Sequence, residues 1–294
     1  MLDRWFRTLA QCPALVRLLG FLLTLALLWL PFLLVLSWAI ADSNWRSIAT
    51  LVLLYLGFIG LVQQWGQIVH GEPRVLVAFG LRGGARQFFT EQLLGLWLGA
   101  MLVLVMFGVE AAMGWAQWVV PQAGFLRIAI EGLLVGLGIG FAEELLFRGW
   151  MWDELSRDWR FPSTLIGTAQ IYAVLHFLKP WNEILRTWPQ FLGLVLLGIL
   201  LGYAKSATRG RLGLPMGLHG GLVWGYYLVN VGQLSQRSQP MGASLAGSGI
   251  AQGQVPDWVT GIDGNPLAGL VGLGFLMAAI ALFAQLHRWT RQRV

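Results

Sequence analysis

Residues 141–150 read Phe141-Ala142-Glu143-Glu144-Leu145-Leu146-Phe147-Arg148-Gly149-Trp150. They follow an apolar run from 128 to 140 that only Glu131 interrupts. Two carboxylates and an arginine therefore lie at the end of a predicted membrane helix. An ionised side chain near the bilayer centre costs about 2.5–3.5 kcal/mol on insertion scales. On a helix, Glu144 and Arg148 are spaced i,i+4 and can pair, whereas Glu143, about 100° round the helix, has no local partner. Glu143 is therefore a candidate base; the alternative is an interfacial salt bridge with a second glutamate that reaches towards the headgroups.

The composition is that of a membrane protein. Of 294 residues, 56% are hydrophobic and 12% are charged, with a mean hydropathy of +0.65, whereas a soluble domain carries about twice that charge. The single cysteine, Cys12, excludes a disulfide within the chain and a cysteine-based zinc site. We therefore predict an all-α polytopic membrane protein, with residues 1–294 forming one transmembrane domain in contact with the lipid bilayer.

The apolar runs predict eight transmembrane helices. Their approximate residues are 18–40, 48–62, 93–115, 125–147, 163–178, 191–204, 212–231 and 266–286. A stretch rich in Gly, Ser and Gln, residues 232–265, is predicted to be a flexible external linker. We expect the catalytic core at about residues 125–231, for the reasons given below.

The positive charges predict the orientation. Fifteen of the 20 lysines and arginines fall in five alternate segments, among them the two termini, and five fall in the four segments between them. Cytoplasmic segments are enriched in Lys and Arg, so both termini are predicted to be cytoplasmic. Because the net charge of +6 follows this membrane pattern, it does not indicate a nucleic-acid partner.

Glycines recur at four-residue steps in two predicted spans. One row is Gly132, Gly136 and Gly140, and the other is Gly213, Gly217, Gly221 and Gly225. Small residues at this spacing let helix backbones approach closely in lipid. Spans four and seven are therefore predicted to lie inside the bundle.

Two of the four histidines lie within predicted spans. His70 and His287 are interpreted as solvated surface residues, but His176 and His219 are candidates for function because ionisable residues inside membranes usually have one. Glu143 and His176 lie about 16 residues on either side of the tip of one predicted helical hairpin, roughly 24 Å from it. His219 is predicted to lie at a similar depth on span seven. The three side chains are thus expected to meet inside the cytoplasmic leaflet.

These residues resemble a known family. Glu143-Glu144-x-x-x-Arg148, an aromatic residue four before a histidine (Tyr172 and His176) and a later intramembrane histidine (His219) are similar to the CAAX prenyl protease and bacteriocin-processing family of intramembrane endopeptidases. The resemblance covers about residues 128–227. It implies eight membrane helices with a site that opens to the cytoplasmic side.

Two positions depart from the family pattern. Tyr172 stands where the family usually has Phe, and Val223 stands where it usually has Asn, four residues after the last histidine. The resemblance implies that this His and Asn together stabilise the oxyanion, so Val223 removes one expected donor. Tyr226, seven residues after His219 on the same helix face, is a weaker candidate for that role.

We therefore expect an intramembrane endopeptidase acting on a membrane-associated peptide or protein. Glu143 would activate water, His176 would hold that water, Glu144 would pair with Arg148, and His219 would donate to the oxyanion. Glu143, His176 and His219 could also bind Zn²⁺, since the family has been described both as metalloproteases and as metal-free glutamate proteases. Without the usual zinc spacing, the metal-free mechanism is slightly favoured.

Two other functions stay open at this stage. The first is a non-catalytic scaffold or immunity-type protein with the same fold, which Val223 favours. The second is a proton-coupled transporter that uses the Glu/His cluster as a relay, although the two halves of the sequence show no repeat. The expected location is a bacterial-type plasma membrane.

Overall fold

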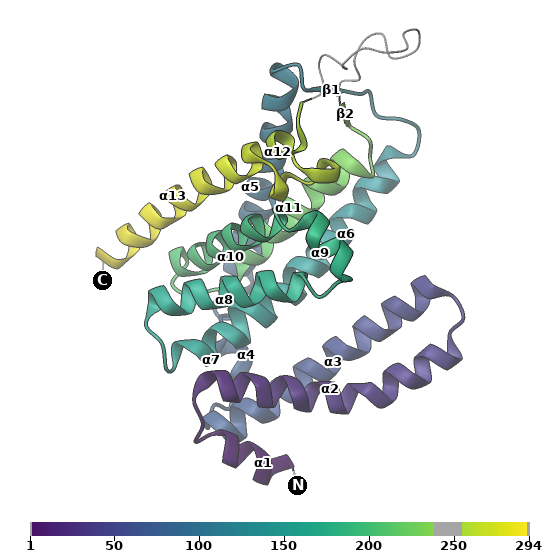
Figure 1. Ribbon diagram of the computed structural model, residues 1–294. Coiled ribbons are helices and arrows are strands. Elements are labelled where there is room, and N and C mark those ends of the chain that lie inside the picture. Colours follow the sequence, from purple (N-terminus) through teal and green to yellow (C-terminus); the bar gives the residue numbers. More distant parts are fainter. Residues whose placement is uncertain (1, 238–254, 293–294) are drawn as a thin grey trace. The chain divides into compact units, whose positions relative to one another are not determined.

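The computed structural model describes residues 2–237 and 255–292, which are almost entirely helical (Figure 1). The longer helices are α1 (Leu2–Leu9), α2 (Ala14–Ala39), α3 (Ser43–His70), α5 (Ala85–Ala112), α6 (Phe125–Glu144), α8 (Phe161–His176), α10 (Gln190–Ala207), α11 (Gly213–Asn230) and α13 (Leu270–Gln292). The shorter helical elements are α4 (Val75–Ala78), η1 (Leu145–Met151), α7 (Trp152–Ser156), α9 (Trp181–Thr187), α12 (Asp257–Thr260), η2 (Ile262–Gly264) and η3 (Pro266–Ala268). The predicted all-α class is thus observed, with the addition of one short antiparallel strand pair, β1 (Ala116–Trp118) and β2 (Ser235–Arg237).

Each of the eight predicted spans corresponds to a helix, but not every one of these helices is long and apolar. Within the described residues, six helical stretches are long and apolar enough to cross a membrane: 14–39, 45–70, 85–112, 125–156, 190–207 and 270–290. The other two predicted spans correspond to α8, with 16 residues, and α11, with 18 residues. The chain is an integral multi-pass membrane protein; the count of eight crossings and the side of the termini stay predictions.

The predicted linker is partly structured where it is described. Its first residues form β2, and its last residues form α12 and η2. Residues 238–254 lie outside the described part of the chain. The flexibility of the linker therefore stays a prediction for those residues.

The chain divides into two compact units. Unit 1 comprises residues 1–82 and 145–164, and unit 2 comprises residues 83–144 and 165–294. The predicted single transmembrane domain and the predicted core at 125–231 stay predictions.

In unit 1, α2 and α3 lie side by side (Figure 1) over an aromatic core. Its rings belong to Phe6, Phe21, Phe58, Trp65 and Trp150.

A buried ionic cluster holds unit 1 together around Glu154. This carboxylate accepts hydrogen bonds from Arg17 and from the Trp65 indole, and it lies 2.9 Å from His70 Nε2. The His70 side chain is only 10% exposed. The interpretation of His70 as a solvated surface residue is therefore wrong, because residues 84 positions apart in the chain bring a carboxylate to it.

In unit 2, the helix α11 packs between α5 and α6. A Cβ atom at Gly136 or Gly140 of α6 would come closer than 3.0 Å to a backbone oxygen of α11. A Cβ atom at Gly217 or Gly221 of α11 would come equally close to a backbone oxygen of α5. The predicted close approach of these backbones is confirmed. The two glycine rows face different neighbours, so α11 is held tightly on both sides and its position along α6 is defined.

Candidate active site

Four predicted site residues come from three helices of unit 2. Glu143 and Glu144 are the last two residues of α6, His176 is the last residue of α8, and His219 lies inside α11. The glycine contacts between α6 and α11 bring the two glutamates beside His219. The structure thus brings together side chains that are up to 76 positions apart in the chain.

Glu143 faces both histidines. Its Oε2 atom lies 3.6 Å from His176 Nε2 and 3.8 Å from His219 Nε2. Glu143 and His176 are 28% and 32% exposed in their side chains, whereas His219 is 4% exposed. Distances slightly beyond direct hydrogen bonding suit a bridging water. The cluster therefore has an open side, at Glu143 and His176, and a buried side, at His219.

Tyr172 orients His176. The Nδ1 atom of His176 lies 2.8 Å from the Tyr172 carbonyl oxygen, and because a carbonyl can only accept, Nδ1 carries the proton and donates it. In the neutral imidazole, Nε2 is then an acceptor and faces Glu143. The Tyr172 ring also lies 4.2 Å from the His176 ring and 6.3 Å from the His219 ring, centroid to centroid.

Glu144 is completely buried and holds His219. Its Oε1 atom lies 2.8 Å from His219 Nδ1, and its side chain is 0% exposed. A carboxylate on Nδ1 fixes the ring and directs Nε2 towards Glu143. The sequence did not indicate this contact, because only the tertiary fold brings α6 and α11 together.

Arg148 lies in unit 1, where it is buried in η1. Its guanidinium carbon lies 5.9 Å from the centre of the Phe147 ring. The segment η1 is a π-helix, in which hydrogen bonds run from i to i+5. The i,i+4 spacing from Glu144 is therefore not a regular α-helical turn, and the pairing of Glu144 with Arg148 stays a prediction.

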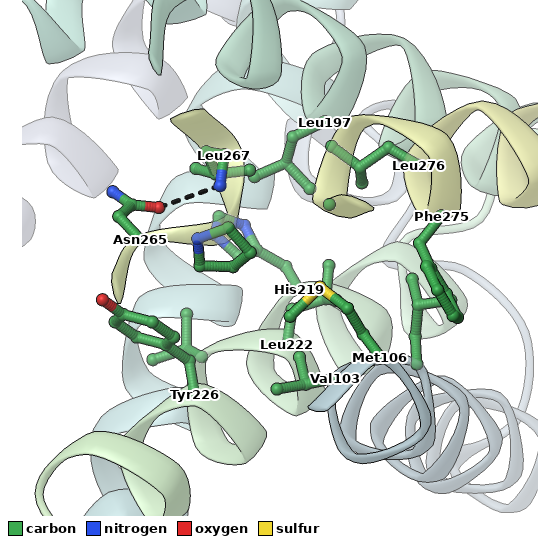
Figure 2. Close-up of a pocket in the computed structure, with 14 residues that line it drawn as sticks. Val103, Met106, Leu197, His219, Leu222, Tyr226, Asn265, Leu267, Phe275 and Leu276 are labelled. Atoms are coloured by element: carbon green, nitrogen blue, oxygen red, sulfur yellow. Dashed lines mark hydrogen bonds between the residues drawn. The ribbon is translucent and has the colours of Figure 1, made fainter. Parts of the chain in front are cut away.

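His219 also lines a cavity of about 190 Å³ (Figure 2). It is lined by Leu102, Val103, Met106, Leu197, His219, Leu222, Val223, Tyr226, Asn265, Pro266, Leu267, Gly272, Phe275 and Leu276. Val223 and Tyr226, which the sequence singled out, therefore share this space with His219. Sequence reasoning missed Asn265, because it lies 46 positions beyond His219 in the segment assigned to the linker.

The predicted zinc ligands do not form a metal site as they are placed. In the described part of the chain, no group of three or more His, Cys, Asp or Glu side chains is arranged to hold a metal ion. His176 and His219 each use Nδ1 for another contact, with the Tyr172 carbonyl and with Glu144, which leaves both Nε2 atoms on the side of Glu143. Zn²⁺ binding by Glu143, His176 and His219 therefore stays a prediction, and the mechanism proposed below uses no metal.

Long apolar helices and a carboxylate–imidazole cluster define a multi-pass membrane protein with a candidate site inside a helical unit. The family model described as Type II CAAX prenyl endopeptidase Rce1-like matches residues 125–225, about a third of the chain. This confirms the resemblance that the sequence indicated, and the matched family is a protease family. No curated protein and no solved structure matches the chain. The matched segment contains all four of the clustered residues of unit 2.

Proposed function

We propose that this chain is an intramembrane endopeptidase that hydrolyses a peptide bond near the cytoplasmic face of a bacterial-type plasma membrane. The observation that carries the proposal is the placement of one partly exposed carboxylate, Glu143, within 3.8 Å of two imidazole nitrogens on other helices. The substrate would be a membrane-associated peptide or protein. The match to a protease family supports this class of reaction.

In the proposed mechanism, Glu143 and His176 hold the attacking water. One O–H group of the water donates a hydrogen bond to Glu143, and the other donates to the Nε2 lone pair of His176. A lone pair of the water oxygen is then free to attack the substrate carbonyl. Glu143 takes the first proton as the new C–O bond forms. It then passes that proton to the amide nitrogen as the C–N bond breaks, so that a carboxylic acid and an amine leave.

His219 would stabilise the tetrahedral intermediate. Glu144 contacts Nδ1, so Nε2 of His219 is directed towards Glu143, where an Nε2–H group would donate to the oxyanion. Glu144 thus acts as a positioning residue for His219.

The test compares membrane-fraction peptides from cells that carry the wild-type chain or the Glu143→Gln variant. A general base contributes about 10²–10⁴ in rate, so Gln at this position should remove measurable cleavage while the protein stays folded. Glu131→Gln, an exposed change on the same helix, is the matched control and should cleave normally. Normal turnover by Glu143→Gln would exclude Glu143 as the base.

A non-catalytic scaffold is the second candidate, and Val223 favours it. An apolar side chain occupies the cavity wall one turn from His219, where the related proteases are expected to place an amide. A folded wild-type chain with no proteolytic products would favour the scaffold.

A further inference from the structure

The polar groups of the cavity gather beside His219. Figure 2 shows Asn265 and Tyr226 on one side of the His219 ring and Leu197, Phe275 and Leu276 on the other. A peptide that places an apolar side chain in the apolar part would bring its backbone carbonyls close to the polar groups beside His219. Each such carbonyl needs a donor, because burying it without one costs on the order of 1–3 kcal/mol.

The side-chain amide of Asn265 has a defined orientation. Its Oδ1 atom accepts a hydrogen bond from the backbone N–H of Leu267, 3.0 Å away, and so caps η3. Only the amide oxygen can accept a hydrogen bond from this N–H, so the remaining polar atom of the side chain is the donor Nδ2. Nδ2 makes no hydrogen bond with residues 2–237 or 255–292, where the structure is described.

Backbone contacts hold Asn265 in place. A Cβ atom at Gly193 of α10 would come closer than 3.0 Å to the carbonyl oxygen of Leu267. A Cβ atom at Gly272 of α13 would come closer than 3.0 Å to the carbonyl oxygen of Pro266. The two residues that follow Asn265 are thus packed directly against glycines of two long helices. An amide fixed in this way loses little conformational entropy when it binds a ligand.

We propose that Asn265 is a substrate-binding residue whose Nδ2 donates to a backbone carbonyl of a peptide with a large apolar side chain in this cavity. The proposal rests on the proposed endopeptidase function, and it adds the substrate class and a binding residue. The peptide is the occupant because the cavity is lined by His219, the residue assigned to the scissile carbonyl.

Binding can be measured without cleavage in the Glu143→Gln chain. The probe is a fluorescein-labelled Leu-Phe-Leu tripeptide amide, and its anisotropy is recorded with the protein in lipid nanodiscs, where excess unlabelled peptide defines specific binding. In this background, Asn265→Asp keeps an oxygen to cap η3 but replaces the donor with an acceptor. We expect it to weaken binding on the order of tenfold.

Asn182→Asp is the matched control, because it adds the same charge at an exposed position of α9. It should leave binding unchanged. Asn265→Ser, which also retains a capping oxygen, is the second variant if Asn265→Asp lowers the unfolding temperature. Equal binding by the parent and a folded Asn265 variant, or no specific binding by the parent, would overturn the proposal.

Probe analogues locate the bonded carbonyl. Three peptides, each with one carbonyl replaced by methylene, are compared on the parent chain and on Asn265→Asp. One analogue should bind the parent on the order of tenfold more weakly and show no further loss with Asn265→Asp, as a shared hydrogen bond requires. If, for every analogue, the loss of binding free energy from the missing carbonyl simply adds to the loss from Asn265→Asp, the proposal is contradicted. Because cleavage is not measured here, an inactive wild-type chain would refute the endopeptidase without deciding the role of Asn265.

Discussion

Glu143 and Glu144 are adjacent in the chain, yet their surroundings suit different tasks. The side chain of Glu143 is 28% exposed and faces two Nε2 atoms, whereas that of Glu144 is 0% exposed and contacts His219 Nδ1. Two carboxylates in different environments can act as a base and as a fixed counter-charge at the same pH. The end of α6 produces this difference, because successive residues point about 100° apart.

Val223 gives the first prediction at the residue scale. Val223→Asn places an amide one turn from His219 on the wall of the same cavity. One oxyanion donor is typically worth about 10²–10³ in rate, so we expect cleavage to become faster by up to this factor, and only while Glu143 is present. The measurement is single-turnover cleavage of a membrane-fraction substrate.

Val223→Leu is the size-matched control for this change and should not accelerate cleavage. An unchanged rate in Val223→Asn would mean that another group already fills the role, and Tyr226→Phe would then be the next variant. Inactivity of both forms in folded protein would favour the scaffold.

Arg148 gives the second prediction at this scale. Its side chain is buried in η1, and removing one member of a buried ion pair costs about 3–5 kcal/mol. Arg148→Ala should therefore lower the unfolding temperature in detergent well below that of Arg157→Ala, which removes an exposed pair with Asp153.

A double-mutant cycle with Glu144→Gln identifies the partner of Arg148. If Glu144 pairs with Arg148, the combined loss of stability should be smaller than the sum of the single losses. Strictly additive losses would show that the predicted pair does not form.

At the scale of elements, glycine determines how closely α11 approaches its neighbours. Gly136 packs against the backbone of α11, whereas a Cβ atom added at Gly138, on the same helix, would meet no other atom within 4 Å in the described part of the chain. Close backbone contact replaces the hydrophobic effect as a source of helix association in lipid. The same contacts bring the glutamates of α6 beside His219 of α11.

These two glycines form a matched pair for a stability test. Gly136→Ala should push α6 from α11, lower the unfolding temperature and reduce cleavage, because Glu144 would no longer reach His219. Gly138→Ala should leave both quantities nearly unchanged. If the two alanine variants have the same unfolding temperature, the α6–α11 contact is not what holds the site.

At the scale of the whole molecule, the open question is how many helices cross the bilayer. The helices α8 and α11 carry His176 and His219, and neither is among the six long apolar stretches of the described chain. Glycine and histidine make α11 less apolar, and α8 is short. Both are nevertheless needed to place the imidazoles.

Cysteine accessibility tests the predicted eight crossings. In a Cys12→Ser background, cysteine at residue 160, before α8, should react with a membrane-impermeant maleimide only after the cells are opened. Cysteine at residue 182, after α8, should react in intact cells, because the charge pattern places that segment outside. Reaction of both positions from the same side would show that α8 does not cross.

Much of the helical architecture could be predicted from sequence, because apolar length and charge asymmetry are local properties of the chain. The same holds for the candidates Glu143, His176 and His219, since an ionisable residue within an apolar run is conspicuous wherever it occurs. The glycine rows likewise indicated close packing. Their periodicity, however, did not show which helix each row faces.

Only the tertiary structure placed Glu144 against His219, His70 against Glu154, and Asn265 beside His219. The first two are direct contacts between residues 75 and 84 positions apart, and Asn265, 46 positions beyond His219, lines the same cavity. They depend on how side chains from different helices meet, and no local pattern of hydropathy or charge encodes that meeting. The sequence therefore determined which residues can do chemistry in the membrane, and the packing of α5, α6, α8, α10, α11 and α13 decided which of them share one site.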